Sequence, residues 1–177
     1  MAVLSRTGAD LEETVGLIEG LAGAGLAVLV DLVDYSQVEN AFATIVRELS
    51  PVDVLINNAG NYVAIGPVWE VDPDEWWHDV EVNVRTTYNC SRVVLPSMIA
   101  RGGGRIINLI GGGTAGAFAY GSGYAVGKSG VMRLTECLAQ EVSDSNVAVL
   151  AMAPGLVRTV MTDYQRTSDA GKNICKP

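Results

Sequence analysis

The sequence has few of the side chains that build metal sites and disulfide frameworks: its 177 residues include one histidine and three cysteines. Cys90, Cys137 and Cys175 are odd in number and widely spaced, which excludes a disulfide framework and favours a reducing, cytoplasmic location. His78 stands in the charged run WWHDVE with no histidine or cysteine at ligand spacing, so it is interpreted as a helix-surface residue. We therefore expect no metal site.

Acidic side chains outnumber basic ones: the sequence has 20 Asp and Glu and 12 Lys and Arg, which gives a net charge of −8. The basic side chains are scattered along the chain, which excludes the basic patch that a nucleic acid or an anionic membrane needs. Apolar runs such as 27–30 are too short to span a bilayer, and residues 1–10 lack the pattern of a signal peptide. With 49% hydrophobic residues and no repeat or linker, residues 1–177 are expected to form one domain.

Short apolar runs alternate with helical patterns, which is typical of β-α-β units and a parallel sheet. The Ser36-x-x-Glu39 pattern predicts a capping box at one helix start, Pro73 suits the first position of another helix, and Pro96 is expected to kink or shorten that helix. No strand is expected in the polar tail after Thr162. The expected strands are 2–5, 26–31, 52–57, 105–110 and 147–153, and the expected helices are 11–21, 36–50, 73–100 and 122–142.

A glycine-rich turn that could hold a diphosphate is absent. In dinucleotide-binding sheets such a turn follows the first strand and brings backbone N–H groups to the phosphates. Thr7-Gly8 follows a strand here, but the next positions, Ala9 to Glu12, bring no second glycine, and Gly20, Gly23 and Gly25 precede a strand. These three glycines are better explained as a helix end and the turn after it.

One helix carries a tyrosine and a lysine four residues apart, Tyr124 and Lys128, which places both on the same helix face. Taken alone, this spacing also fits an ordinary solvated pair. Three further motifs occur in a fixed order around it, namely Asn57-Asn58-Ala59-Gly60, Asn83, and Pro154-Gly155-Leu156-Val157 with Thr159. Together, from Ala2 to about Thr162, they make the sequence resemble the short-chain dehydrogenase/reductase family.

The resemblance implies a Rossmann-like doubly wound parallel sheet in three αβα layers and an oxidoreductase that transfers hydride between NAD(P)(H) and an alcohol or carbonyl. Tyr124 would be the general acid/base. A phenol has a pKa near 10, so it needs a nearby cation to stabilise its phenolate, and Lys128 would supply that charge while binding the nicotinamide ribose. Asn83 would hold a water on the proton path, although a polar residue within a helix is the simpler alternative.

The resemblance also implies a cofactor site. Asn58, Ala59 and Gly60 would lie beside the adenosine ribose, and Asp31 would bond the adenine amino group. Arg6 follows the first strand where NAD-preferring members have an acid, which favours NADP with Arg6 on its 2′-phosphate, although a surface arginine is the plain alternative. The nicotinamide amide and its phosphate would be held by Pro154, Gly155, Val157 and Thr159.

The chain departs from the family pattern at the residue that helps the tyrosine. A serine that bonds the substrate oxygen is expected at Gly111 or at Ile110, and neither is serine. Thr114 is the nearest hydroxyl and could take this role only if the glycine loop folds back. Ile110, Gly111 and Thr114 are thus the expected substrate contacts, and losing one such hydrogen bond costs on the order of 10²–10³ in rate.

The ends of the chain depart as well, because the family's first strand with its glycine turn and its last strand have no counterpart. Met1 therefore resembles a start inside a longer domain. A parallel sheet without a central strand would have an apolar slot and unpaired backbone groups, so we expect the chain to bind NADP poorly.

Two functions remain open. The first is an NAD(P)-dependent oxidoreductase whose substrate the apolar loop 61–71 does not specify. The second is a catalytically impaired remnant that pairs with a full-length relative, and an unrelated Rossmann-like binder is a weaker third. The resemblance implies homo-oligomers that pack through the helices at 73–100 and 122–142.

Overall fold

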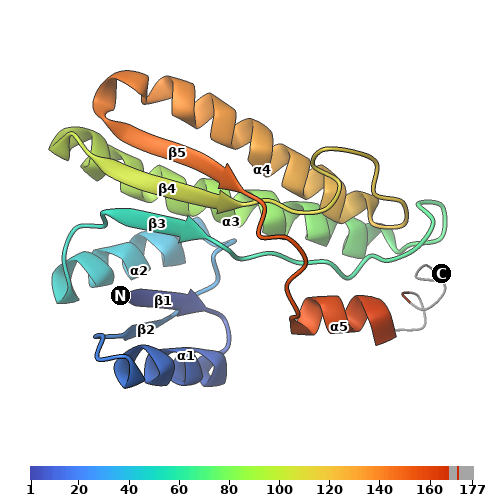
Figure 1. Ribbon diagram of the computed structural model, residues 1–177, viewed down its shortest axis with the longest axis horizontal. Helices are drawn as coiled ribbons and strands as arrows, with labels where there is room; N and C mark the ends of the chain where they lie inside the picture. The colour runs from blue at the N-terminus through green and yellow to red at the C-terminus, as the bar shows by residue number, and fades with distance from the viewer. Residues whose placement is uncertain (168–170, 172–177) are drawn as a thin grey trace.

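The computed structural model describes residues 1–167 and 171, in which parallel strands are flanked by helices (Figure 1). Cys175 and most of the polar tail lie outside the described residues. The strands are β1 (Ala2–Ser5), β2 (Leu26–Leu29), β3 (Val54–Asn57), β4 (Gly104–Leu109) and β5 (Val147–Met152). The helices are α1 (Gly8–Gly20), α2 (Tyr35–Glu48), α3 (Pro73–Arg101), α4 (Ser122–Glu141) and α5 (Val160–Thr167), with a 3-10 turn at Ser143–Ser145.

The strands form two parallel sheets. β1 pairs with β2 in the register Ala2 to Leu26, and β3, β4 and β5 form a three-stranded sheet in that order. Within residues 1–167 and 171, no strand pairs β1 with β3, and a cavity of about 590 Å³ is lined by both strands. The expected α/β fold is therefore confirmed, and so is the slot expected within its sheet.

The start of α2 differs from the expected capping box. The N-cap is Asp34, whose Oδ1 accepts hydrogen bonds from the backbone N–H groups of Ser36 at 2.9 Å and Gln37 at 3.2 Å. The prediction that Ser36 caps this helix is therefore wrong. A carboxylate accepts these orphan N–H groups at least as well as a hydroxyl, and it stands two residues earlier in the chain.

The long helix α3 lies within one residue of its expected bounds of 73–100, and Pro96 does not shorten it. Asp72 caps it, Pro73 takes the first helical position, and the helix continues through Pro96 to Arg101. Gly102 ends it with φ 66°, a left-handed conformation that a glycine adopts without steric cost. Because Pro96 lies near the end, the one hydrogen bond that it removes does not stop the helix.

The short helix α5 was not predicted; its eight residues begin with Val160 and Met161 and carry no buried side chain. A threonine cap explains it, since Thr159 Oγ1 accepts the backbone N–H of Thr162 at 3.2 Å. No described helix is long and apolar enough to cross a membrane.

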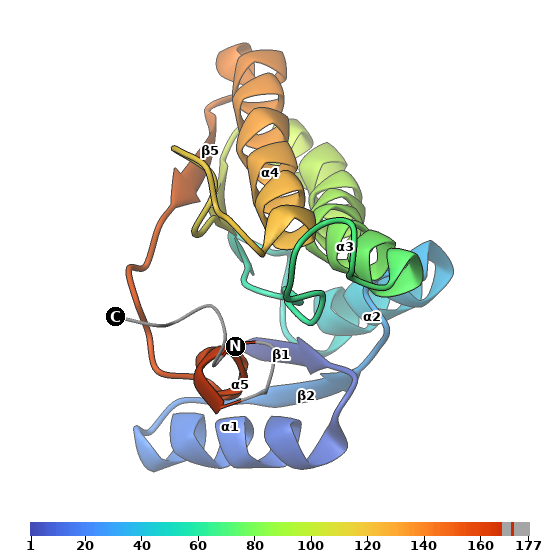
Figure 2. The ribbon, with the colours of Figure 1, turned by 90° about the vertical axis from the view of Figure 1, so that its right-hand side faces the viewer.

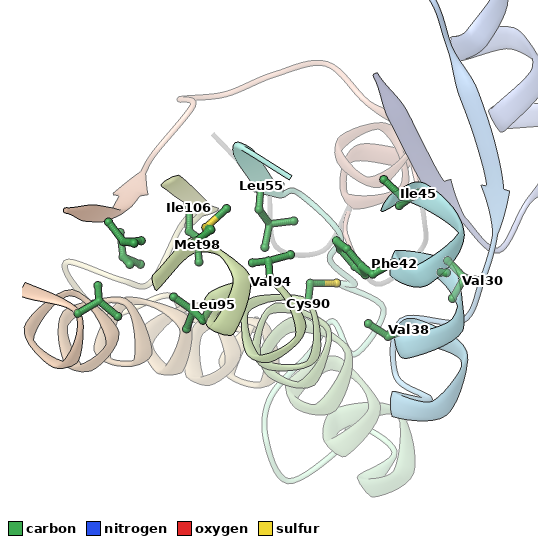
Figure 3. Close-up of a cluster of buried hydrophobic side chains, with 14 residues drawn as sticks. Val30, Val38, Phe42, Ile45, Leu55, Cys90, Val94, Leu95, Met98 and Ile106 are labelled. Carbon is green, nitrogen blue, oxygen red and sulfur yellow. The ribbon is translucent and has the colours of Figure 1, made fainter. Parts of the chain in front are cut away.

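The core joins α2 and α3 to the three-stranded sheet (Figure 3). Phe42 of α2 packs in one cluster with Leu55 of β3, Cys90 and Met98 of α3, and Ile106 of β4. Helices α3 and α4 lie on one face of this sheet, as Figure 2 shows. On the other face apolar side chains are exposed, and these are Val54, Ile56, Leu150 and Met152.

Candidate active site

Tyr124 and Lys128 lie on successive turns of α4 and do not form a solvated pair. The Lys128 side chain is only 5% exposed, and its Nζ donates a hydrogen bond to the Leu109 carbonyl at 2.9 Å, where β4 ends. The same Nζ lies 5.8 Å from the centroid of the Tyr124 ring. The helix therefore holds a buried ammonium beside a half-buried phenol.

Burial dominates the electrostatics of this pair. It lowers the pKa of Lys128 to about 8, because the buried ammonium loses hydration. Burial also raises the pKa of Tyr124, so at neutral pH the phenol is neutral. The charge of Lys128 was expected to lower the pKa of Tyr124. In this arrangement the ammonium bonds a carbonyl, and burial raises the pKa of Tyr124 instead.

Asn83 of α3 brings an unpaired oxygen to the same place. Its Nδ2 donates to the carbonyls of Asn61 and Asp79, both at 2.7 Å, whereas its buried Oδ1 has no hydrogen-bond partner in the described part of the chain. A Cβ added at Gly60 would lie 2.8 Å from this Oδ1 and 3.3 Å from Lys128 Nζ. The missing side chain at Gly60 therefore leaves a polar space between an acceptor and an ammonium, of the kind that a water or hydroxyl fills.

Gly111 lies directly against the hydroxyl of Tyr124. A Cβ built at Gly111 would overlap the Tyr124 hydroxyl oxygen, so the phenol occupies space that any side chain here would need. Ile110, the other position considered for a serine, continues the β4–β5 ladder by donating its N–H to the Met152 carbonyl at 3.0 Å. Of these two positions, Gly111 is therefore the one that contacts Tyr124.

Thr114 comes back to Gly111, but its hydroxyl is already bonded. Its Oγ1 donates to the Gly111 carbonyl at 2.6 Å, and its N–H reaches the same oxygen at 3.3 Å. The glycine loop therefore does fold back as a turn. The single hydroxyl hydrogen of Thr114 cannot serve a substrate oxygen while this bond exists.

Two aromatic rings beside Tyr124 were not expected from the sequence. The Tyr62 ring centroid lies 5.0 Å from that of Tyr124, and the Phe118 ring lies 6.1 Å from it. The buried carboxylate of Asp79 holds the Tyr62 loop by accepting the N–H groups of Val63 and Ala64 at 2.9–3.1 Å. Asp79 and Asn83 are four residues apart, as are Tyr124 and Lys128. This spacing could have indicated from the sequence that Asp79 faces the same site as Asn83.

A second unexpected feature is a buried amide network beneath the site. Asn57 Nδ2 donates to Asn108 Oδ1 at 2.8 Å and to Ser91 Oγ at 3.2 Å, and Asn108 Nδ2 donates to Thr135 Oγ1 at 2.8 Å. The network joins β3 and β4 to both long helices. It fixes the strand ends from which Gly60 and Gly111 extend.

The residues expected at the cofactor fall into two groups. Arg6, Asp31, Asn58, Ala59 and Gly60 all line the cavity between β1 and β3. Pro154, Gly155, Val157 and Thr159 do not line it; all four are exposed, and the Thr159 hydroxyl bonds Thr162. The Asp31 carboxylate also accepts the N–H of Val33 at 3.0 Å.

The fit to a nicotinamide dinucleotide is therefore partial. The unpaired Asn83 oxygen and the space at Gly60 suit a hydroxyl-bearing ligand near Lys128. Among residues 1–167 and 171, no Gly-rich turn stands at this cavity to hold a diphosphate, and the middle part of the cavity is bounded by strand edges. Among the described residues, no three His, Cys, Asp or Glu side chains are grouped to hold a metal ion.

Comparison with known proteins gives a consistent result. A family model described as short chain dehydrogenase matches residues 1–170. The short chain dehydrogenase mpl6 of Monascus purpureus is 32% identical over 183 aligned residues, which cover 100% of this chain and 62% of that protein. The 3-oxoacyl-[acyl-carrier-protein] reductase FabG of Thermotoga maritima is 29% identical over 87% of this chain and 62% of its own length.

Solved structures agree with these relatives. An actinorhodin polyketide ketoreductase with NADPH has a TM-score of 0.89 and 28% identity, covering 95% of this chain and 66% of that one. An NAD⁺-bound xylitol dehydrogenase has a TM-score of 0.91 at 22% identity, covering 99% and 67%, which shows likeness of fold alone.

The chain spans about 62% of the length of the curated relatives that it matches. An unrelated Rossmann-like binder, the weakest of the three expectations, is excluded by the family match. The chain belongs to the short-chain dehydrogenase/reductase family.

Proposed function

We propose that this chain carries the acid/base site of an NAD(P)-dependent oxidoreductase that interconverts an alcohol and a carbonyl compound. One observation carries the proposal: a phenol, a buried ammonium and an unpaired amide oxygen converge between Gly60 and Gly111. We further propose that residues 1–177 form one incomplete cofactor-binding domain.

Tyr124 would transfer the proton to or from the substrate oxygen. Its pKa is raised by burial, so it would act as a proton donor in carbonyl reduction at neutral pH. Lys128, whose pKa of about 8 lies close to neutral, can return a proton through a water held by Asn83 Oδ1. Gly111 supplies no hydroxyl to the substrate oxygen, and this should slow the reaction.

The cofactor in this proposal is NADP, which when bound supplies or accepts the hydride. Arg6 would contact its 2′-phosphate, Asp31 the adenine, and Asn58 to Gly60 the adenosine ribose, because these residues line one cavity. Pro154, Gly155, Val157 and Thr159 would contact the nicotinamide end only after movement of their exposed segment.

The partners in this proposal are a small alcohol or carbonyl substrate and a second copy of the chain in the cytoplasm. Exposed apolar side chains on α3 and α4 support self-association through these helices. They are Trp77, Tyr88, Ile99, Val126 and Met132.

The test is carbonyl reduction followed by loss of NADPH absorbance over a panel of ketones. We expect slow turnover that Tyr124→Phe lowers at least 10²-fold, because the variant removes the proton donor. Tyr164→Phe, an exposed tyrosine on α5, is the matched control and should change nothing. Equal activity of Tyr124→Phe and the wild type would remove the acid/base assignment, and no turnover in any variant would favour the impaired remnant.

The helper position is tested separately. Gly111→Ser places a hydroxyl beside Tyr124 and, if the ring moves to admit it, should raise kcat about 10-fold or more. Ile110→Ser tests the other candidate position in the same assay. A rise with Ile110→Ser alone would show that the helper belongs at residue 110.

A further inference from the structure

Asp79 of α3 is a carboxylate with 0% of its surface exposed. Burying a charge is costly unless other groups bond it, and within the described part of the chain no basic side chain forms a salt bridge with this one. Its Oδ1 accepts Asn61 Nδ2 at 2.8 Å and the Val63 N–H at 3.0 Å, and its Oδ2 accepts the Ala64 N–H at 2.9 Å. The carboxylate therefore bonds three donors of the loop that directly follows Gly60.

Close packing of α3 on α4 fixes the backbone from which Asp79 extends. A Cβ built at Gly123 of α4 would lie 2.9 Å from the Trp76 carbonyl oxygen and 3.4 Å from the Asp79 Cβ. A Cβ built at Gly127, one turn later, would lie 2.8 Å from the Asn83 Cβ. Because the two helices meet this closely, Asp79 and Asn83 stand on a rigid support, and the loop is the part that can move.

The loop supplies one of the two carbonyls that orient the Asn83 amide. Asn83 Nδ2 donates to the carbonyls of Asn61 and Asp79, both at 2.7 Å. These two acceptors fix which end of the amide is the donor, and its Oδ1 is thereby directed to the space beside Gly60 and Lys128. If the loop moved, the amide would keep only the acceptor on its own helix.

The same loop carries the ring of Tyr62 between two residues that Asp79 bonds. This ring is 5% exposed, and its centroid lies 5.0 Å from that of Tyr124. A Cβ built at Gly121, the residue before α4, would lie 2.5 Å from the Tyr62 hydroxyl oxygen. A shift of the loop would therefore change the packing on the Tyr124 ring.

We propose that Asp79 is a positioning residue of the candidate acid/base site. Its carboxylate holds residues 61–64 so that Asn83 directs its Oδ1 toward Lys128. The same bonds hold an aromatic ring of the loop against Tyr124. The effect of Asp79 on turnover rests on the proposed function, whereas its effect on the geometry of the site does not.

The first test is Asp79→Asn, followed by NMR of the protein with ¹³C-labelled tyrosine and lysine. The variant keeps the size of the side chain but replaces one acceptor oxygen with a donor, so one loop donor loses its partner. We expect the Tyr124 ring resonance to shift and the pKa of Lys128 to rise from about 8 toward its usual 10.5, because a loosened loop admits water to the ammonium. An unchanged resonance together with an unchanged pKa would overturn the proposal.

Asp34→Asn is the matched control for this variant. Asp34 also accepts two backbone N–H groups, but it caps α2 and lies outside the candidate site. The substitution removes the same charge, so an effect of net charge alone would appear in both variants. We expect Asp34→Asn to leave the Tyr124 resonance and the pKa of Lys128 unchanged, and equal changes in the two variants would contradict a positioning role.

A double variant tests the hydrogen bonds directly. In Asp79→Asn with Asn61→Asp, the amide at residue 79 can donate to the carboxylate at residue 61 and still accept a loop N–H, so the bond returns with its direction reversed. We expect the double variant to restore the Tyr124 resonance and the Lys128 pKa, whereas Asn61→Asp alone opposes two carboxylates and disturbs both. Failure of the double variant to restore either value would contradict the proposal.

A milder variant keeps the test decisive if Asp79→Asn does not fold. Asn61→Ala removes one of the three loop donors at a half-buried residue and leaves both backbone bonds in place. It should move the Tyr124 resonance in the same direction as Asp79→Asn would, by a smaller amount. No movement in this variant would overturn the proposal.

Turnover separates the role of Asp79 from the proposed function. In the carbonyl-reduction assay Asp79→Asn should lower kcat by about tenfold and leave the KM for NADPH unchanged, because it misplaces the acid/base groups without touching the cofactor. An equal loss in Asp34→Asn would contradict this. The NMR measurements need no turnover, so a wild type without activity would count against the proposed function and leave the positioning by Asp79 to be decided by the Tyr124 resonance and the Lys128 pKa.

Discussion

The two halves of the molecule differ in how deeply they bury the residues that were expected to form the site. The half built from β3, β4, β5, α3 and α4 surrounds Lys128 with buried helices and a satisfied amide network. In the half built from β1, α1 and β2, α1 contributes a single buried residue, Leu11, and β1 is only half-buried. The arrangement of Tyr124, Lys128 and Asn83 therefore persists in a fold whose other half is open.

The open half also explains why the family resemblance alone does not establish turnover. Arg6 and Asp31 follow the ends of β1 and β2, which pair with each other and not with β3, β4 or β5 among residues 1–167 and 171. Tyr124 and Lys128 depend on none of those contacts, because α4 packs on α3 and β5. Substitutions in one half at a time therefore test whether the two halves differ in this way.

The largest contrast is expected in stability. Ile106→Ala, in the fully buried centre of β4, should lower the free energy of unfolding by about 2–5 kcal/mol through lost packing and a cavity. Leu29→Ala, at a side chain 68% exposed on β2, should change it by less than about 0.5 kcal/mol. Urea denaturation checks both, and equal losses would mean that the halves are equally packed.

A smaller effect is expected when the buried ammonium is removed. The lowered pKa of Lys128, about 8 against a usual 10.5, means that burial destabilises the charged form. Lys128→Met should therefore stabilise the fold at pH 7 by about 1–3 kcal/mol, after loss of its bond to Leu109.

The pH dependence of this effect has a definite sign. Between about pH 8 and pH 10.5 the unfolded chain binds a proton at Lys128 that the folded chain has lost, so wild-type stability rises across this window relative to Lys128→Met. The penalty is fully present below pH 8. Arg133→Met, an exposed change on the same helix, should show no such difference, and chemical denaturation at several pH values would reveal it.

Two glycines, one in each half, are expected to give effects of opposite sign, and the one in α1 gives the smallest effect. Gly60→Ala should cost about 1–3 kcal/mol, because its Cβ enters the space between Asn83 and Lys128. Gly16→Ala, inside α1 with nothing within 4 Å of its Cβ, should stabilise the chain by about 0.5–1 kcal/mol. Thermal unfolding shows whether each substitution stabilises or destabilises the chain. A stabilising Gly60→Ala would contradict the polar space between Asn83 and Lys128.

The sequence predicted most of the fold, because hydrophobic periodicity is a local signal. The strands and the four longer helices fall within a few residues of their expected bounds, and the slot was expected from the missing central strand. The Asp34 cap was missed because Ser36 offered an equally good local pattern. Helix α5 was missed because it is only eight residues long and has no buried side chain.

The sequence predicted less of the candidate site, because several of its contacts join residues that are far apart in the chain. Tyr124, Lys128, Asn83 and Gly60 were all named in advance and lie together, although their catalytic roles stay predictions. The rings of Tyr62 and Phe118 reach Tyr124 from separate loops, and no spacing in the chain encodes that contact. The dominance of burial over the lysine charge likewise depends on packing that only the structure gives.

The most direct test of the account is calorimetric titration of the chain with NADPH. We predict binding weaker than micromolar, because the cavity lined by Arg6 and Asp31 is bounded by open strand edges and, among residues 1–167 and 171, has no glycine turn for the diphosphate. Micromolar or tighter affinity would contradict it, and would mean that the open half holds the cofactor as firmly as the other half holds Lys128.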